Sequence, residues 1–168
     1  MSERTNLEQV SSSVRDKIFE AKTAGHFENT RELFEDYARY LDFDLDLQDF
    51  ASELTNLPGD YAAPHGCIFL AADEEQIVGC VALRKWDETV CEMKRLYVKP
   101  ELQGYGIGRS LAQAMILKAR ALGYKRMRLD TLFSMHAANL LYASLGFRPI
   151  EPYRYNPLED AQFYELLL

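Results

Sequence analysis

Three glycines alternate along the chain at Gly104, Gly106 and Gly108, between an apolar segment and a run with helical periodicity. Glycine lets the backbone adopt positive φ angles and approach a ligand closely. The N–H groups of such a loop, together with the N-terminus of the following helix, favour a bound anion. The spacing therefore predicts a loop that holds the phosphates of a cofactor.

The glycine spacing also separates the common phosphate-binding motifs. A Walker A loop needs a Lys-Ser or Lys-Thr pair after its last glycine, and this chain has Arg109-Ser110 at that place. A dinucleotide fingerprint has the spacing G-x-G-x-x-G near the start of a domain, whereas here the spacing is G-x-G-x-G past the middle of the chain. The first motif is excluded and the second is weakened, so a dinucleotide-binding domain stays an alternative.

Residues on both sides of the loop extend the pattern. Gln103–Gly108 reads QGYGIG, which fits the motif [RQ]-x-x-G-x-[GA]; Glu92–Val98 reads EMKRLYV, and Asn139–Phe147 reads NLLYASLGF. Together these segments resemble the GNAT superfamily of N-acetyltransferases over roughly residues 68–150. In residues 15–67 only the order of the elements is similar.

The resemblance implies a fold and a cofactor. The fold is α/β, with a mixed, mostly antiparallel twisted sheet flanked by helices and splayed after the central strand at 89–98. The acyl donor is acetyl-CoA, and no metal is implied. Free backbone N–H groups of that strand would bind the pantetheine arm and the thioester carbonyl, and the loop would bind the pyrophosphate. The implied cofactor-binding residues are Leu96, Tyr97, Val98, Gln103, Gly104, Tyr105, Gly106, Ile107, Gly108, Arg109 and Asn139.

Two residues are implied as catalytic by their place in the family pattern. Glu92 occupies the position of a general-base glutamate, which would take a proton from the amine directly or through water. Tyr142 would act as the general acid on the leaving thiolate. On a regular strand Glu92 shares a face with Lys94, Leu96 and Val98, provided that no bulge intervenes. An ion-paired strand carboxylate and a packed helix tyrosine are the alternative interpretations.

Other reactive side chains carry weaker signals. His136 is expected in the first turn of a helix, where a structural role is more common than a catalytic one. Cys80 and Cys91 are expected in the core, which disfavours a route through an acetyl-cysteine.

Hydrophobic periodicity and turn residues predict the elements that position these groups. Three short-linked strands in the middle of the chain indicate an antiparallel meander. The predicted strands cover residues 17–22, 67–72, 76–84, 89–98, 126–131 and 163–168, and the predicted helices cover residues 27–41, 47–57, 109–122 and 136–145.

The acceptor site is expected between the N-terminal helices, the loop 58–66 and the segment 149–160. Aromatic and acidic side chains in these segments would form a rim suited to a cationic amine. Arg148 and Arg154 could equally serve a carboxylated substrate. The aromatic candidates are Phe34, Tyr37, Tyr40, Phe43, Tyr61, Tyr153 and Tyr155, and the acidic ones are Asp42, Asp44, Asp46 and Asp49.

Composition sets the remaining limits. The 168 residues suit one domain at 14–168 after a flexible tail at 1–13, and the net charge of −7 argues against a nucleic-acid partner. Three cysteines without metal-binding spacing predict reduced thiols, and no apolar run is long enough to cross a membrane. A cytoplasmic location follows. The apolar last strand could pair with a second copy, which makes a homodimer one option.

Taken together, the sequence predicts an acetyl-CoA-dependent N-acetyltransferase that acts on a primary amine of a small molecule or amino acid by direct transfer. Acetylation of a protein N-terminus or lysine and a non-catalytic acyl-CoA-binding module are the alternatives.

Overall fold

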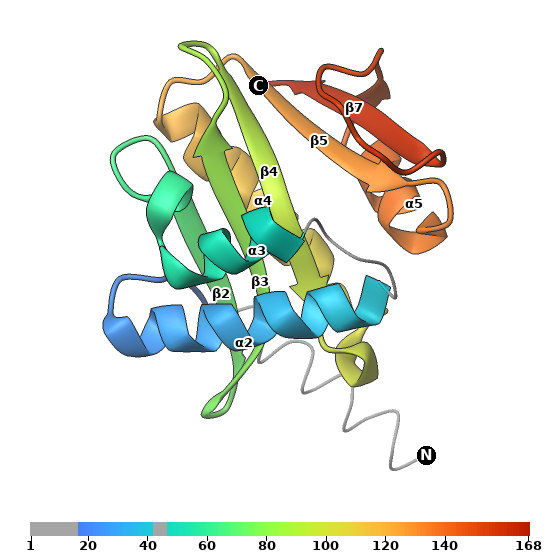
Figure 1. The fold of residues 1–168 in the computed structure, drawn as a ribbon. Helices are drawn as coiled ribbons and strands as arrows, with labels where there is room; N and C mark the ends of the chain where they lie inside the picture. Colours follow the sequence, from blue (N-terminus) through green and yellow to red (C-terminus); the bar gives the residue numbers. More distant parts are fainter. Residues whose placement is uncertain (1–16, 42–46) are drawn as a thin grey trace.

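One open sheet of seven strands carries helices on both faces (Figure 1). The computed structural model describes residues 17–41 and 47–168. The strands are β1 (Ile18–Glu20), β2 (Cys67–Asp73), β3 (Gln76–Lys85), β4 (Val90–Val98), β5 (Arg126–Leu132), β6 (Arg148–Pro149) and β7 (Ala161–Leu167). The helices are α2 (Ala24–Leu41), α3 (Leu47–Thr55), α4 (Ile107–Ala121) and α5 (His136–Ser144), and short 3-10 turns cover Gly59–Tyr61 and Pro100–Leu102.

The sheet order is β1-β2-β3-β4-β5-β7-β6, and among the strands of the described residues only the β4–β5 pair is parallel. The mixed, mostly antiparallel sheet and the central meander β2-β3-β4 confirm the predicted fold class. Side chains along β3 alternate between two cores, as a pleated strand requires. Cys80 and Ala82 pack with residues of α2, whereas Val81 and Leu83 pack with residues of α4. The strand therefore separates the two helical layers seen in Figure 1.

Helix α4 begins at Ile107, two residues before the predicted start. Gly106 has a φ of 85°, which ends the loop, and the Ile107 side chain is buried in the core. Gly108 lies inside the first turn, where an added Cβ would meet Val98 at an ordinary 3.8 Å. The positive φ at position 106 favours glycine, whereas neither the backbone conformation nor the space at position 108 requires it.

The last strand, which the sequence offers for pairing with a second copy, is not the outermost strand of the described sheet. β7 lies between β5 and the two-residue β6, which pairs with it at Tyr164 and Glu165. The return of the chain after α5 places β6 outside β7 and covers part of its edge. In the described structure the rest of that edge has no strand beside it, and a homodimer stays a prediction.

Some predictions fall on residues that the structure does not describe, including the tail at 1–13 and Asp42, Phe43, Asp44 and Asp46. Among the described residues, no helix has the length and apolar character needed to cross a membrane.

Candidate active site

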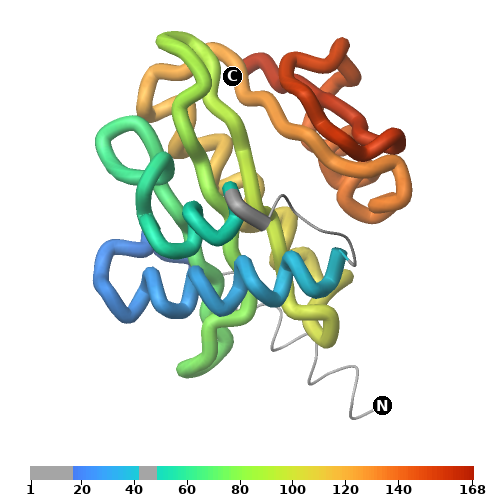
Figure 2. Tube along the Cα trace, in the orientation of Figure 1, coloured from blue at the N-terminus to red at the C-terminus, as the bar shows by residue number. Residues whose placement is uncertain are grey.

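Strands β4 and β5 are paired over only three residues. Val90, Cys91 and Glu92 pair with Arg126, Met127 and Arg128, respectively. Beyond Glu92 the two strands diverge, as the gap between the yellow-green and orange segments in Figure 2 shows. A cavity of about 440 Å³ is lined by residues of both strands, of α2, α3 and α5, and of the segment 154–158.

A β-bulge at Arg95 reshapes β4 where it borders the cavity. Ala82 pairs with Lys94 and Cys80 pairs with Tyr97, so Arg95 and Leu96 together stand opposite one residue of β3. Arg95 has a φ of 58°, an uncommon backbone conformation for a residue with a side chain. The extra residue reverses the alternation of the strand beyond it.

The bulge makes the predicted common face of Glu92, Lys94, Leu96 and Val98 wrong. Leu96 and Val98 pack with the core on the α4 side, whereas Tyr97 packs with the core on the α2 side. No glycine or proline marks the bulge in the sequence, so the residue pattern of this strand does not indicate it.

The backbone of β4 after Glu92 has a free edge. No strand in the described part of the chain pairs with that edge on the β5 side. The predicted backbone contacts at Leu96, Tyr97 and Val98 lie along this stretch. An unpaired strand edge offers N–H and C=O groups to a ligand.

The glycine loop follows β4 directly and is tied to its end. The Gln103 side chain donates to the Val98 carbonyl at 2.9 Å, and Gly104 and Gly106 have φ angles of 83° and 85°. Ser110 N–H donates to the Gly106 carbonyl, which is the first bond of the α4 ladder. The N–H groups of 107–109 therefore have no intrahelical acceptor and lie at the positive end of the helix dipole.

The remaining residues of the predicted loop site surround these amides. Tyr105 is half-buried in the loop, and Ile107 points into the core. The Arg109 guanidinium donates to Ser144 Oγ at 2.7 Å, which links the start of α4 to α5.

Helix α5 brings the predicted Tyr142 to the cavity lining and places the predicted Asn139 against the end of β5, outside that lining. Asn139 Nδ2 donates to the carbonyls of Leu132 and Phe133 at 2.9 and 3.3 Å. Its Oδ1 is buried and meets no hydrogen-bond donor in the described structure. A buried acceptor without a partner is uncommon and calls for an explanation, such as a ligand that supplies the donor.

Tyr142 lines the cavity and packs its ring edge-on against Phe147, with 5.7 Å between centroids. Burial raises the pKa of the Tyr142 hydroxyl above its usual range, so this group is a proton donor at neutral pH. Burial likewise raises the pKa of Tyr37, which lines the cavity from α2, to about 12.

The predicted Glu92 does not reach the cavity lining. Its side chain is 0% exposed; Arg84 Nε donates to Oε1 at 2.8 Å, and Arg84 Nη2 forms an ion pair with the same oxygen at 2.6 Å. The Tyr153 hydroxyl donates to Oε2 at 2.6 Å. Both oxygens are thus occupied, and any proton that Glu92 takes from an amine must pass through another group.

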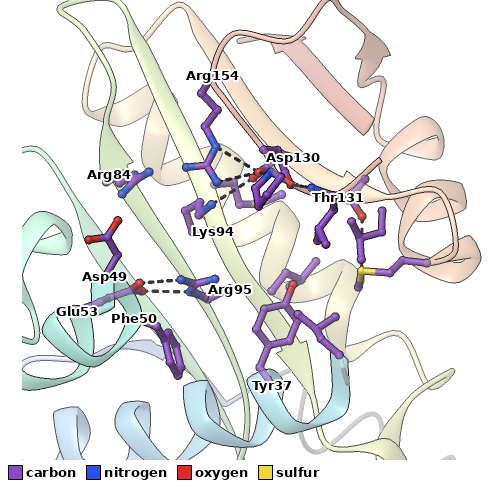
Figure 3. Close-up of a pocket in the computed structure, with 18 of the residues that line it drawn as sticks. Tyr37, Asp49, Phe50, Glu53, Arg84, Lys94, Arg95, Asp130, Thr131 and Arg154 are labelled. Atoms are coloured by element: carbon purple, nitrogen blue, oxygen red, sulfur yellow. Dashed lines mark hydrogen bonds and ion pairs between the residues drawn. The ribbon is translucent and has the colours of Figure 1, made fainter. Parts of the chain in front are cut away.

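Asp130 joins three donors across the gap between the strands (Figure 3). Lys94 Nζ lies 3.1 Å from Oδ1, and Arg154 Nη2 and Asn156 Nδ2 lie 2.8 and 3.1 Å from Oδ2. Burial alone would raise the pKa of Asp130, but Lys94 and Arg154 outweigh it and hold the pKa at about 2. The carboxylate is charged at every physiological pH.

A second ion pair fixes the bulge from the opposite side of the cavity. Glu53 of α3 accepts from Nε and Nη2 of Arg95 at 3.1 and 2.7 Å, and the Tyr61 hydroxyl donates to it at 2.7 Å. The Arg95 guanidinium also lies 5.3 Å from the ring centroid of Phe50. Although burial opposes it, the Arg95 pair lowers the pKa of Glu53, so this acid too stays charged.

The predicted acidic, aromatic rim is only partly present. Tyr37, Asp49 and Tyr155 line the cavity, whereas Phe34 and Tyr61 are buried in the core. Tyr153 is bound to Glu92 and does not line the cavity, and Tyr40 is exposed outside the lining. Instead the lining contains four cations, Arg84, Lys94, Arg95 and Arg154, of which only Arg154 was proposed as a substrate contact.

Asp130 and Arg84 were missed as site residues, although the sequence carried one signal. Asp130 interrupts an apolar strand, MRLDTL, and a charge at such a place needs a partner. Its partners lie 36 and 24 residues away in the chain, so the sequence does not show which they are.

The other reactive side chains lie away from the cavity. His136 is exposed at the start of α5, and Arg148 is exposed on β6. Burial raises the pKa of the Cys91 thiol to about 12 and that of Cys80 further, which disfavours their thiolates. In the described part of the chain, no three His, Cys, Asp or Glu side chains are grouped to hold a metal ion.

Comparison with known proteins gives consistent matches. Residues 27–147 match the family described as "Acetyltransferase (GNAT) family". An uncharacterized N-acetyltransferase of Schizosaccharomyces pombe is 39% identical over 136 residues, which cover 80% of this chain and 83% of the relative. An acetyltransferase structure from Streptococcus agalactiae aligns with a TM-score of 0.76 at 24% identity, covering 90% of this chain and 98% of the other. A GNAT family acetyltransferase from Elizabethkingia anophelis, solved with acetyl-CoA bound, aligns with a TM-score of 0.55 at 29% identity, covering 67% and 82%.

Proposed function

Because this chain belongs to the GNAT family of acetyltransferases and is an N-acyltransferase, we propose that it transfers an acetyl group from acetyl-CoA directly to the primary amine of a small molecule or amino acid. The observation that carries the proposal is the splay of β4 and β5, which leaves a strand edge beside a cavity of about 440 Å³. That volume suits a small acceptor better than a folded protein surface.

The residues at the splay fit the acyl donor. The free edge at 96–98 offers N–H and C=O groups to the amides of a pantetheine arm, and Asn139 Oδ1 lacks the donor that such an arm would supply. The amides at the start of α4 and the positive-φ glycines offer an anion site for a diphosphate. The relative from Elizabethkingia anophelis binds acetyl-CoA, which supports the same assignment here.

The transfer forms a bond between the amine nitrogen and the thioester carbon and breaks the carbon–sulfur bond. An N–H group of the β4 edge would stabilise the charge on the carbonyl oxygen, an interaction that can contribute about 10²–10³ in rate. Tyr142 would give its proton to the leaving thiolate, for which its raised pKa keeps it protonated.

Removal of the proton from the ammonium is assigned to Glu92 acting through water. Its oxygens are occupied by Arg84 and Tyr153, so it acts on the amine at a distance. Glu92 could take the proton or could only hold Arg84 in place, and the pH profile of kcat/KM distinguishes these two roles. If Glu92 takes the proton, Glu92→Gln changes the shape of the profile; a profile of unchanged shape refutes the assignment.

The proposal extends to one domain over residues 14–168 and to a cytoplasmic location. Cys67, Cys80 and Cys91 are free and buried, which supports a reducing compartment.

Release of free thiol from acetyl-CoA over a panel of amines and amino acids tests the function. Acetyl-CoA is expected to stabilise the protein by about 2.7 kcal/mol at one hundred times its Kd. Stabilisation without thiol release from any acceptor would indicate a non-catalytic acyl-CoA-binding module. Stabilisation by NAD and not by acetyl-CoA would contradict the cofactor assignment.

A further inference from the structure

Three cations from β3, β4 and the segment 154–158 surround two buried carboxylates beside the cavity. Arg84 is bound to Glu92 at 2.6 Å, and Lys94 and Arg154 are bound to Asp130 at 3.1 and 2.8 Å. Arg154 Nε also lies 4.0 Å from Glu92, so the five side chains form one connected cluster. We call this set the cation cluster.

The cation cluster carries one positive charge more than its carboxylates balance. The nearby Arg95–Glu53 pair is neutral as a unit and does not remove that surplus. Asp60 lies 3.7 Å from Arg84, but its side chain is 81% exposed, and water screens such a pair. The other acid of the lining, Asp49, is exposed on α3.

The surplus charge is presented to the cavity and not hidden beneath it. Glu92 and Asp130 are 0% and 8% exposed and Lys94 is 9% exposed, whereas Arg84 and Arg154 are 23% and 29% exposed, so the two arginines present the surplus. Among the contacts of the described residues, Arg154 uses Nε and Nη2 on carboxylates, and no partner occupies its Nη1. Figure 3 shows Arg84, Lys94 and Arg154 grouped above the bulge residue Arg95.

We propose that the acetyl acceptor carries a carboxylate beside its amine and that this carboxylate binds Arg154 and Lys94, with Arg84 next to them. The inference rests on the proposed acetyltransferase function and narrows its substrate to amino acids or similar carboxylated amines. A guanidinium fork matches a planar carboxylate, and a single surplus charge matches a monoanion. A phosphate monoester, with a charge of about −1.5 to −2, matches it less well.

The position of the cation cluster also suits the reaction. Lys94 directly precedes the bulge, and the free edge of β4 begins at the same place. A carboxylate held by Lys94 and Arg154 would place its neighbouring amine in the cavity that the free edge also borders, where the thioester is proposed to bind.

The test compares each of the twenty amino acids with its own carboxamide, as acceptors in thiol release and as ligands in calorimetric titrations with CoA present. The amino acids are expected to be favoured about 10²-fold in kcat/KM, since a charge-assisted hydrogen bond is lost in the carboxamide. Equal values for both series in turnover and binding would overturn the inference. So would a preference for phosphoethanolamine over every amino acid.

Variants locate the carboxylate. Arg154→Gln is expected to lower kcat/KM for amino acids about 10–100-fold, with little change for carboxamides or in the KM for acetyl-CoA. Arg154→Lys should show a smaller loss, because the charge stays and the fork is removed. Arg148→Gln, an exposed site outside the cavity lining with the same change of charge, is the matched control. Equal losses for both acceptor series in Arg154→Gln would refute the contact.

The binding measurements keep this inference separate from the proposed function. If amino acids bind in preference to carboxamides but release no thiol, the carboxylate site stands and the acetyltransferase proposal fails. If amino acids and carboxamides are acetylated equally well, the acetyltransferase function is supported and the carboxylate site is refuted.

Discussion

Asp130 holds the two sides of the splay together, and its removal has a calculable cost. Lys94 and Arg154 hold its pKa at about 2, against the ordinary 3.8, although burial acts in the opposite direction. At about 1.4 kcal/mol for each pH unit, the difference corresponds to about 2.5 kcal/mol of folding stability. Because the folded-state pKa is depressed, this contribution is complete above about pH 4 and is lost as the pH falls toward 2.

Asp130→Asn should cost more than this amount at pH 7. The substitution leaves Lys94 buried without its counter-charge, and breaking a buried pair costs about 3–5 kcal/mol. Burial lowers the pKa of Lys94 even with Asp130 present, which shows how poorly this site solvates an isolated ammonium. Adding Lys94→Met to Asp130→Asn should therefore recover part of the loss, about 1–3 kcal/mol.

Urea unfolding measures these free energies, with fluorescence of Trp86, the only tryptophan, as the probe. Trp86 packs against Tyr153 at 5.0 Å and so reports on this side of the site. Asp60→Asn is the matched control; its side chain is 81% exposed, and we expect a change within about 0.5 kcal/mol. A loss below about 1 kcal/mol in Asp130→Asn would refute the reasoning. So would wild-type and variant curves that keep the same separation from pH 4 to pH 2.

Three further predictions concern residues that are proposed to bind or react with the acyl donor. Tyr142→Phe should lower kcat about 10²–10⁴-fold in thiol release at saturating acetyl-CoA; an unchanged kcat would remove Tyr142 from the chemistry. Asn139→Leu should weaken acetyl-CoA about 10-fold in calorimetric titrations, because the unpartnered Oδ1 is lost; equal affinity would mean that no ligand donor meets it. Gly104→Ala should cost about 1–2 kcal/mol in urea unfolding, because its φ is 83°. Gly108→Ala, which meets only ordinary contacts, should cost less, and equal costs would contradict the backbone argument.

Local sequence signals predicted most of the elements. Turns at residues 73–75 and 86–88 gave the meander β2-β3-β4, and helical periodicity gave α2, α4 and α5 to within a few residues. The place of β7 was not readable in the same way. Its apolar residues show that it is a strand, but whether β6 covers its edge depends on how the chain returns after α5.

The site residues likewise fall into those that a local motif predicts and those that only the three-dimensional fold brings together. The glycine loop, Asn139 and Tyr142 were recognised because a local motif carries each of them. The cation cluster was not, because its members are brought together by topology. Lys94, Asp130 and Arg154 lie on β4, on β5 and on the segment between β6 and β7. Asp130 interrupts an apolar strand and Arg154 is a candidate contact for a carboxylated substrate, but the sequence does not show that they meet, and only the splay puts them around one cavity.

The bulge connects the helix α3 to the chemistry of β4. A positive φ at a residue with a side chain costs about 1–3 kcal/mol and persists only where neighbouring contacts hold it. At Arg95 those contacts come from α3, through the two bonds to Glu53 and the ring of Phe50. The bulge determines which side chains of β4 face the cavity. Because contacts from α3 hold Arg95 in the bulge conformation, α3 also positions the free edge of β4. Substitutions in α3 that release Arg95 should therefore lower the rate of acyl transfer, because they change the backbone conformation of β4 at the bulge.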